Sequence, residues 1–315
     1  MDTKQITCQN PVVAFMQPER EYRAADGVNQ SAMKALLTSP AHYLAEYGPN
    51  AEPRFPTAAM IWGSAFHAKV LEPEAFDNLF YDRSQKAKDP TITELKVMLD
   101  ESNIEYPKTA KKAELEALLW PEGKKPDRRT SLDSKDYEGI NRAADALRSH
   151  DITGEWFCPG VDEYRRFNEV SLYVKSESGL LMKGRFDRMI KSEDTVTILD
   201  LKTTQDASFK GFQRSVVNFS YDLQAAWYIE LAKRAYPGTQ IEFIFCAIEK
   251  RAPYGIGVFR ASDELIQSGV RKMNKAIDLY QQCTVLDYWP SYDPIVHELT
   301  LPPWAVGAEE EDSEF

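Results

Sequence analysis

The feature of this sequence that most limits its fold is a series of three strand-like runs between residues 168 and 202. In order, the runs read NEVSLYV, GLLMKGRFDRMI and TVTILDLK. The segments between them, KSESG and KSED, are polar or contain glycine, as hairpin turns require. The pattern therefore predicts an antiparallel meander of three strands. Two later runs, QIEFIFCAIEK and YGIGVFRA, predict two more strands.

Helical patterns precede and follow these strands. Residues 29–47 predict two helices that separate at Ser39 and Pro40, and residues 57–76 predict another helix that is rich in small residues. Two more helices are expected after the meander, one from about Tyr221 and one over residues 265–283. Helices arranged around mixed strands predict an α/β or α+β fold, with a central mixed β-sheet flanked by helices.

The charge of the chain limits its function. The formal net charge is −11, from 38 lysines and arginines against 49 acids. This acidity argues against a histone-like protein that holds phosphates with excess basic residues. It does not exclude a nucleic-acid enzyme whose acids bind a metal. No basic segment followed by an apolar run opens the sequence, and no apolar stretch reaches about 18 residues, so neither a secretory signal nor a membrane span is expected. Four scattered cysteines predict free thiols and a cytoplasmic protein.

Residues 83–130 differ from the rest of the chain. They contain 11 basic and 9 acidic residues, which makes them the only long segment with a positive balance. Between basic, proline-containing flanks, the pattern predicts a helix capped by Thr93, an extended loop, and a second helix from Thr109 or Ala110. The segment resembles the helix-extended-loop-helix modules related to SAP and LEM motifs, which often bind DNA. A small helical hairpin that contacts protein is the alternative interpretation.

The residues that carry chemistry lie in the meander. Side chains alternate along a strand, so Asp200 and Lys202 share one face in TILDLKTT. If residues 191–194 form the turn, Asp187 lies opposite Ile198 and is the diagonal neighbour of Asp200, at roughly 7–8 Å between backbones. Two carboxylates this close repel each other unless a cation lies between them. Mg²⁺ suits such a pair, together with waters and a phosphate oxygen, and would activate water to attack a phosphodiester.

Four further residues could complete this site. Glu169 opens the meander, and Gln224 and Tyr228 lie four apart on a helix, so they project from one side. His67 stands among small residues in GSAFHAKVLEP. Each also has an ordinary explanation. Glu169 could be a surface residue, Gln224 and Tyr228 could belong to an amphipathic helix, and His67 could be a core residue. The combination of all of them, rather than any one, indicates a site.

The order E…GRFD…DLK…Q-x-x-x-Y resembles the PD-(D/E)-x-K nuclease superfamily, in its RecB-like exonuclease branch. The upstream segments QSAMKALLTSPAHYLAEY and GSAFHAKVLEPEAF are similar to the exodeoxyribonuclease VIII (RecE) nuclease domain and its phage relatives. The resemblance covers most of residues 22–285 apart from the insert. It implies a restriction-endonuclease-like core with a small helical insertion.

The resemblance also implies roles for particular residues. Its metal ligands would be the side chains of His67, Asp187 and Asp200 and the main-chain carbonyl of Leu201, with Glu169 as a less certain ligand. Lys202 would be the catalytic lysine. Gln224 and Tyr228 would lie beside the active site and contact DNA. The cofactor would be Mg²⁺, with Mn²⁺ as a substitute.

The function implied by the resemblance is digestion of linear double-stranded DNA from 5′ ends, which leaves 3′ single strands. The expected partners are a single-strand annealing recombinase and further copies of the chain in a homo-oligomeric ring, within a phage or prophage recombination system. Two alternatives stay open: a structure-specific endonuclease on the same core, and a DNA-binding or scaffold module that does not cleave.

These interpretations divide the chain into four parts. They are an N-terminal helical part of the nuclease domain (1–82), the inserted module (83–130), the nuclease core (131–304) and an acidic disordered tail (305–315).

Overall fold

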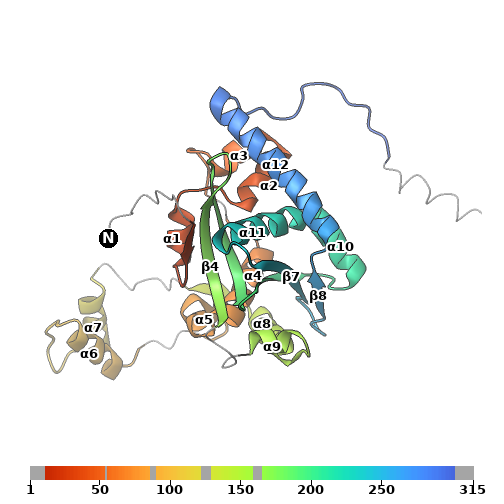
Figure 1. Cartoon of the computed structure of the whole chain (residues 1–315). Coiled ribbons are helices and arrows are strands. Elements are labelled where there is room, and N and C mark those ends of the chain that lie inside the picture. The colour runs from red at the N-terminus through yellow and green to blue at the C-terminus, as the bar shows by residue number, and fades with distance from the viewer. Residues whose placement is uncertain (1–10, 54, 86–89, 122–128, 159–164, 302–315) are drawn as a thin grey trace, which may run out of the picture.

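The structure, a computed structural model, describes residues 11–53, 55–85, 90–121, 129–158 and 165–301. Its centre is a six-stranded sheet in the order β1-β4-β5-β6-β7-β8 (Figure 1). Strands β6 and β7 are parallel, and the other neighbours are antiparallel. The predicted mixed sheet and five predicted strands are therefore confirmed. The strands are β1 (Val12–Ala14), β4 (Arg166–Lys175), β5 (Leu181–Lys191), β6 (Thr195–Thr204), β7 (Gln240–Glu249) and β8 (Ile256–Arg260).

Helices cover both faces of this sheet, and each face has its own apolar core. One core is formed with α2 (Gln30–Thr38), α10 (Phe209–Asn218), α11 (Tyr221–Ala235) and α12 (Asp263–Leu286). The other is formed with α4 (Ala58–Leu71), α5 (Pro73–Leu79), α8 (Ser134–Ser149) and α9 (Thr153–Phe157). Two short helices, α1 (Glu19–Ala24) and α3 (Pro40–Tyr47), lie in the N-terminal part. In the described part of the chain, no helix has the length and apolar character needed to cross a membrane.

Strand β6 shows how the alternation of side chains serves both cores. Val196 and Ile198 are fully buried on the face of α11, whereas Leu199 and Leu201 are buried on the face of α4 and α8. Because both faces are covered, the strand buries apolar side chains on both sides up to Asp200 and Lys202. The two charged side chains therefore occupy positions where an apolar residue would otherwise pack.

Several predicted helix boundaries are wrong, each for a local reason. The helix expected over residues 57–76 is two helices, since Pro73 cannot continue α4 and instead begins α5. The structure adds a helix, α10, before the one expected from about Tyr221. The second helix of the insert begins at Lys112, after Lys111, and not at Thr109 or Ala110.

The predicted register of the central hairpin is wrong by two residues. Met189, not Asp187, lies opposite Ile198. The loop consists of residues 192–195, closed by a hydrogen bond from the Ser192 amide to the Thr195 carbonyl (2.8 Å), so Lys191 remains in the strand opposite Val196. A shift of two residues alone would leave each side chain on its predicted face, because the period of a strand is two. Beyond Arg188, however, where the pairing ends, Asp187 lies beside His67 of α4, whereas Asp200 lies beside Gln224 of α11.

The inserted segment leaves and re-enters the body between two paired strands. These are β2 (Phe80–Asp82) and β3 (Thr130–Leu132), which are parallel. Between them, α6 (Ile92–Glu101) and α7 (Lys112–Leu119) enclose a separate small core. The cap of α6 is Thr91, not Thr93, and it forms a capping box with Glu94. Residues 90–121 contain four lysines and six acids, so the positive balance of the insert comes from its flanks.

Two expectations concern parts of the chain with little structural description. The acidic tail, residues 305–315, lies outside the described residues. Of the four cysteines, Cys158, Cys246 and Cys283 are free thiols, and Cys8 is also outside the described residues.

Gly184 permits the close packing of α11 on β5. A Cβ atom added there would lie 2.4 Å from Leu231 Cδ1 and 3.1 Å from the Tyr228 ring. We expect Gly184→Ala to lower the free energy of unfolding by about 1–3 kcal/mol, as overpacking of a core does. Gly139→Ala is the matched control, because its added methyl group meets only Tyr254 Oη at 3.6 Å and a helical alanine is favoured over glycine. Urea denaturation that finds both variants equally stable would contradict this account.

Candidate active site

The site begins where strands β5 and β6 diverge. Their backbone pairing ends at Arg188 and Leu199, so the peptide of Leu201 has no partner from β5 in the ladder. Asp187 takes the place of that partner, because its Oδ2 accepts a hydrogen bond from the Leu201 amide at 2.7 Å. The carboxylate of Asp187 is thus fixed at the fork between the two strands.

His67 reaches the same peptide from α4. Its Nε2 donates to the Leu201 carbonyl at 3.1 Å, which leaves the Nδ1 lone pair directed toward Asp187, 3.7 Å from Oδ1. Burial and the charge of Lys202 lower the pKa of His67, so the imidazole is neutral. A neutral imidazole with one nitrogen held by a carbonyl is the form in which histidine binds metals.

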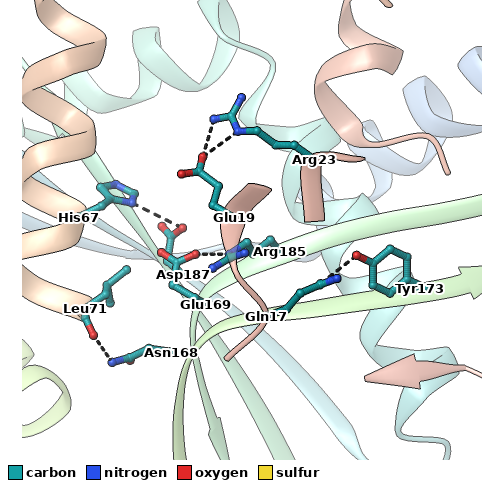
Figure 2. A network of polar contacts seen from close by, with 10 residues as sticks. All are labelled: Gln17, Glu19, Arg23, His67, Leu71, Asn168, Glu169, Tyr173, Arg185 and Asp187. Atoms are coloured by element: carbon teal, nitrogen blue, oxygen red, sulfur yellow. Dashed lines mark hydrogen bonds and ion pairs between the residues drawn. The ribbon is translucent and has the colours of Figure 1, made fainter. Parts of the chain in front are cut away.

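Glu169 approaches from β4. Its φ of 50° places it in the left-handed region, between the paired residues Asn168 and Val170. The carboxylate forms an ion pair with Arg185 and lies beside Asp187 and His67 (Figure 2). One ligand atom from each of His67, Glu169 and Asp187 lies within 4.8 Å of the others.

The pKa values of the two acids of this triad are shifted in the same direction. Burial and the neighbouring Asp200 raise the pKa of Asp187. Burial and the neighbouring Asp187 raise the pKa of Glu169, against the opposing effect of Arg185. Both acids therefore hold protons more strongly than they would in water, as expected for buried carboxylates that lie close to one another.

The triad fits a divalent cation in both chemistry and spacing. Around an octahedral Mg²⁺, adjacent ligand atoms are about 3.0 Å apart and opposite ones about 4.2 Å apart, from bonds of about 2.1 Å. The 3.7 Å between His67 Nδ1 and Asp187 Oδ1 falls between these values. Two carboxylates and one imidazole also suit Mn²⁺. Small side-chain movements would suffice to bring the three groups onto one ion.

Asp200 forms the centre of a second group on the far side of Leu201. It is 1% exposed, forms an ion pair with Lys202, and accepts a hydrogen bond from Gln224 Nε2 at 2.7 Å. Burial acts to lower the pKa of Lys202, but the charges of Asp200 and Asp187 outweigh it and raise the pKa overall. Lys202 is therefore charged at neutral pH, and an electrostatic role suits it better than a role as a neutral base.

Tyr228 forms part of the wall of a cavity that opens at the metal-binding triad. The cavity has a volume of about 980 Å³ and is lined by residues of α1, α2, α3, α4, β4 and β5. Tyr228 is 8% exposed, and its ring lies 4.9 Å from that of Phe186. Its hydroxyl stays protonated, because burial raises its pKa.

Apart from Tyr228, which lines the cavity and packs against Phe186, the side chains expected at the site lie around Leu201 in two adjoining groups. The triad comprises His67, Glu169 and Asp187, and the second group comprises Asp200, Lys202 and Gln224. The roles of these residues as ligands or catalysts remain predictions. Two neighbours were not predicted: Arg185, which pairs with Glu169, and Tyr221, whose ring centre is 5.0 Å from Lys202 Nζ.

Comparison with known proteins places this geometry in a family. Residues 29–294 match the model of a PDDEXK-like domain of unknown function, DUF3799. The chain belongs to this family. The PDDEXK-like assignment agrees with the acid, acid and lysine arrangement at the fork of β5 and β6. No match is found among curated protein sequences.

Solved structures support the fold. The crystal structure of a "Putative exonuclease" from Eubacterium rectale is similar over 94% of this chain and 99% of that chain, with 12% identity and a TM-score of 0.55. A structure called SSO0001 aligns over 73% of this chain and 89% of that chain, with 14% identity and a TM-score of 0.27. At this identity, the first comparison shows that the PDDEXK-like fold, a mixed sheet flanked by helices, is shared.

The raised pKa values of the triad predict that metal binding depends on pH. A cation must displace protons from Asp187 and Glu169, so its affinity should increase as pH rises through their pKa values. We expect Mn²⁺ to bind more weakly and release more protons at about pH 6 than at about pH 8. Calorimetry in two buffers with different ionisation enthalpies measures both quantities. Equal affinity at both pH values, or equal affinity in Asp187→Asn, would contradict the assignment.

Proposed function

We propose that this protein is a metal-dependent nuclease that hydrolyses phosphodiester bonds in DNA. The observation that carries the proposal is that Leu201 lies between two groups of side chains with different chemical roles. On one side lie the groups that suit a cation, and on the other lies the charged amine of Lys202. A cation beside the phosphodiester and a positive charge near its oxygens both favour attack by water.

The residues have distinct parts in this mechanism. Asp187, Glu169 and His67 would hold Mg²⁺ or Mn²⁺, with Asp200 and the Leu201 carbonyl as further proposed ligands. The chemistry that a cation would supply there is polarisation of the phosphodiester and a lower pKa of bound water.

Lys202 is held in place by Asp200, which Gln224 orients in turn. Its positive charge would stabilise the negative charge that develops on the phosphate oxygens during attack. Because its pKa is raised, it keeps this charge throughout the physiological range of pH.

The finer features of the proposal rest on the similarity to exodeoxyribonuclease VIII. They are digestion of linear double-stranded DNA from 5′ to 3′, the production of 3′ tails for an annealing recombinase, a ring of identical subunits and a cytoplasmic location. The similarity in fold to a protein described as an exonuclease supports the requirement for an end.

A structure-specific endonuclease on the same core is the second candidate. It would use the same residues, so only the substrate separates the two. Digestion of end-labelled linear duplex with Mg²⁺, beside closed circular duplex and an EDTA control, reveals activity, metal dependence, polarity and the need for an end. Cleavage of the closed circle would favour the endonuclease.

Substitution of the central charges tests the catalytic assignment. We expect Lys202→Met and Asp200→Asn each to reduce Mg²⁺-dependent cleavage by on the order of a hundredfold to a thousandfold, since each removes a charge beside the reacting phosphate. Lys191→Met is the control, because Lys191 is an exposed lysine at the end of the neighbouring strand. Full activity of purified, folded Lys202→Met would overturn the role of this lysine.

A further inference from the structure

A second lysine lies by the ring of Tyr221, as Lys202 does. Lys34 lies on α2, which packs beside α11 and α12 (Figure 1). Its Nζ is 5.5 Å from the centre of the Tyr221 ring, and Lys202 Nζ is 5.0 Å from the same point. Both lysines are half-buried. Two ammonium groups are thus held against one aromatic ring, beside the proposed reaction centre.

The charge of Lys34 has no carboxylate partner among the described residues. Asp200, one of the two acids that act on it, is already engaged, with one oxygen bonded to Gln224 and the other paired with Lys202. Asp222, the other acid, is engaged as well.

Asp222 is surrounded by donors from its own helix and from α12. Its oxygens accept from Lys272 Nζ at 2.9 Å, from Ser268 Oγ at 2.9 Å and from the Leu223 amide at 2.9 Å. These bonds fasten α11 to α12 and leave Asp222 committed to Lys272. Among the described residues, the neighbour that faces the Lys34 ammonium group is therefore the ring of Tyr221.

The environment of Lys34 is unfavourable for a cation. Burial and the charge of Lys202 lower the pKa of Lys34 to about 8. A half-buried ammonium group beside another ammonium group is stabilised when an anion lies within reach of both. The acids of the metal-binding triad are in the opposite situation, because a bound cation would stabilise their charged forms.

We infer that Lys34 is a phosphate-binding residue, which together with Lys202 holds one phosphate group of the bound strand against Tyr221. The inference rests on the proposed nuclease function, because a phosphodiester is the anion that the adjoining metal-binding triad would bring here. Lysine binds phosphate as a point charge and does not need the planar geometry of arginine. Lys34 would position the strand and would not take part in bond cleavage.

Lys34→Met tests this role, since it keeps the length of the side chain and removes the charge. We expect kcat/KM to fall about tenfold to a hundredfold, as when a hydrogen bond to a charged group is lost. The slope of log K against log salt for an oligonucleotide bound with Ca²⁺ should fall by about 0.7–0.9, which corresponds to one phosphate contact. The melting temperature should not decrease, because no ion pair is broken. A purely structural lysine would show the reverse pattern.

Two controls accompany this variant. Lys233→Met removes an exposed lysine near the end of α11 and should leave the activity and the salt slope unchanged. Lys34→Arg keeps the charge and should retain more activity than Lys34→Met. If Lys34→Met matches Lys233→Met in KM and in salt slope while the wild type cleaves DNA, the inference is overturned and the proposed function stands.

A direct measurement separates the inference from the proposed function. Lysines carrying ¹³C-methyl groups can be followed by NMR, and the signal of Lys34 is identified by its absence in Lys34→Arg. A deoxynucleoside monophosphate should shift this signal even if the wild-type protein cleaves no DNA, an outcome that would refute only the proposed function. A signal that does not move at saturating nucleotide would refute the phosphate-binding role.

Discussion

The peptide of Leu201 is the point on which the site depends. Where β5 and β6 stop pairing, the amide and carbonyl of a buried residue would have no partner, and each such group costs about 1–3 kcal/mol if unsatisfied. Asp187 satisfies the amide and His67 satisfies the carbonyl. The same two side chains are therefore needed to close the fork and to form the candidate metal site. The side chains that stabilise the fold at this fork are therefore the ones that would bind the metal.

This fork also separates the charges of the site. Asp187 and Glu169 lie on the side of α4, where burial and neighbouring carboxylates raise their pKa values. Lys202 lies on the side of α11, beside Tyr221. Asp200 stands between them and is buried so deeply that it acts on the pKa of both Asp187 and Lys202. A phosphodiester placed across the fork would meet positive charge on one side and, with a bound cation, on the other side too.

The strands were predictable because their signal is local: alternating side chains and polar turns follow each other along the chain. The register was not, since the loop is closed by hydrogen bonds between Ser192 and Thr195 that no composition rule selects. The proximity of His67 to Asp187 depends on the packing of α4 on the sheet, and only the resemblance to known nucleases indicated it.

Two other site residues, Lys34 and Arg185, stand out in the sequence by their charge. Lys34 is the only charged residue in QSAMKALLT, an otherwise apolar and small-residue helix. A single lysine among apolar residues is costly unless it has a task or a partner. Arg185 stands two residues before Asp187 and pairs across the strands with Glu169, a pairing of opposite charges that a correct hairpin model allows.

The net charge of −11 does not conflict with binding to DNA. At physiological ionic strength, charges further apart than about 8 Å are largely screened from one another when they are exposed to solvent. Most of the acids of this chain therefore exert little electrostatic repulsion on a phosphate at the fork. What such a phosphate would meet is a few half-buried groups that are screened far less, among them Lys202 and Lys34. The local order of charges around Leu201, and not their sum over the chain, determines which ligand this site can hold.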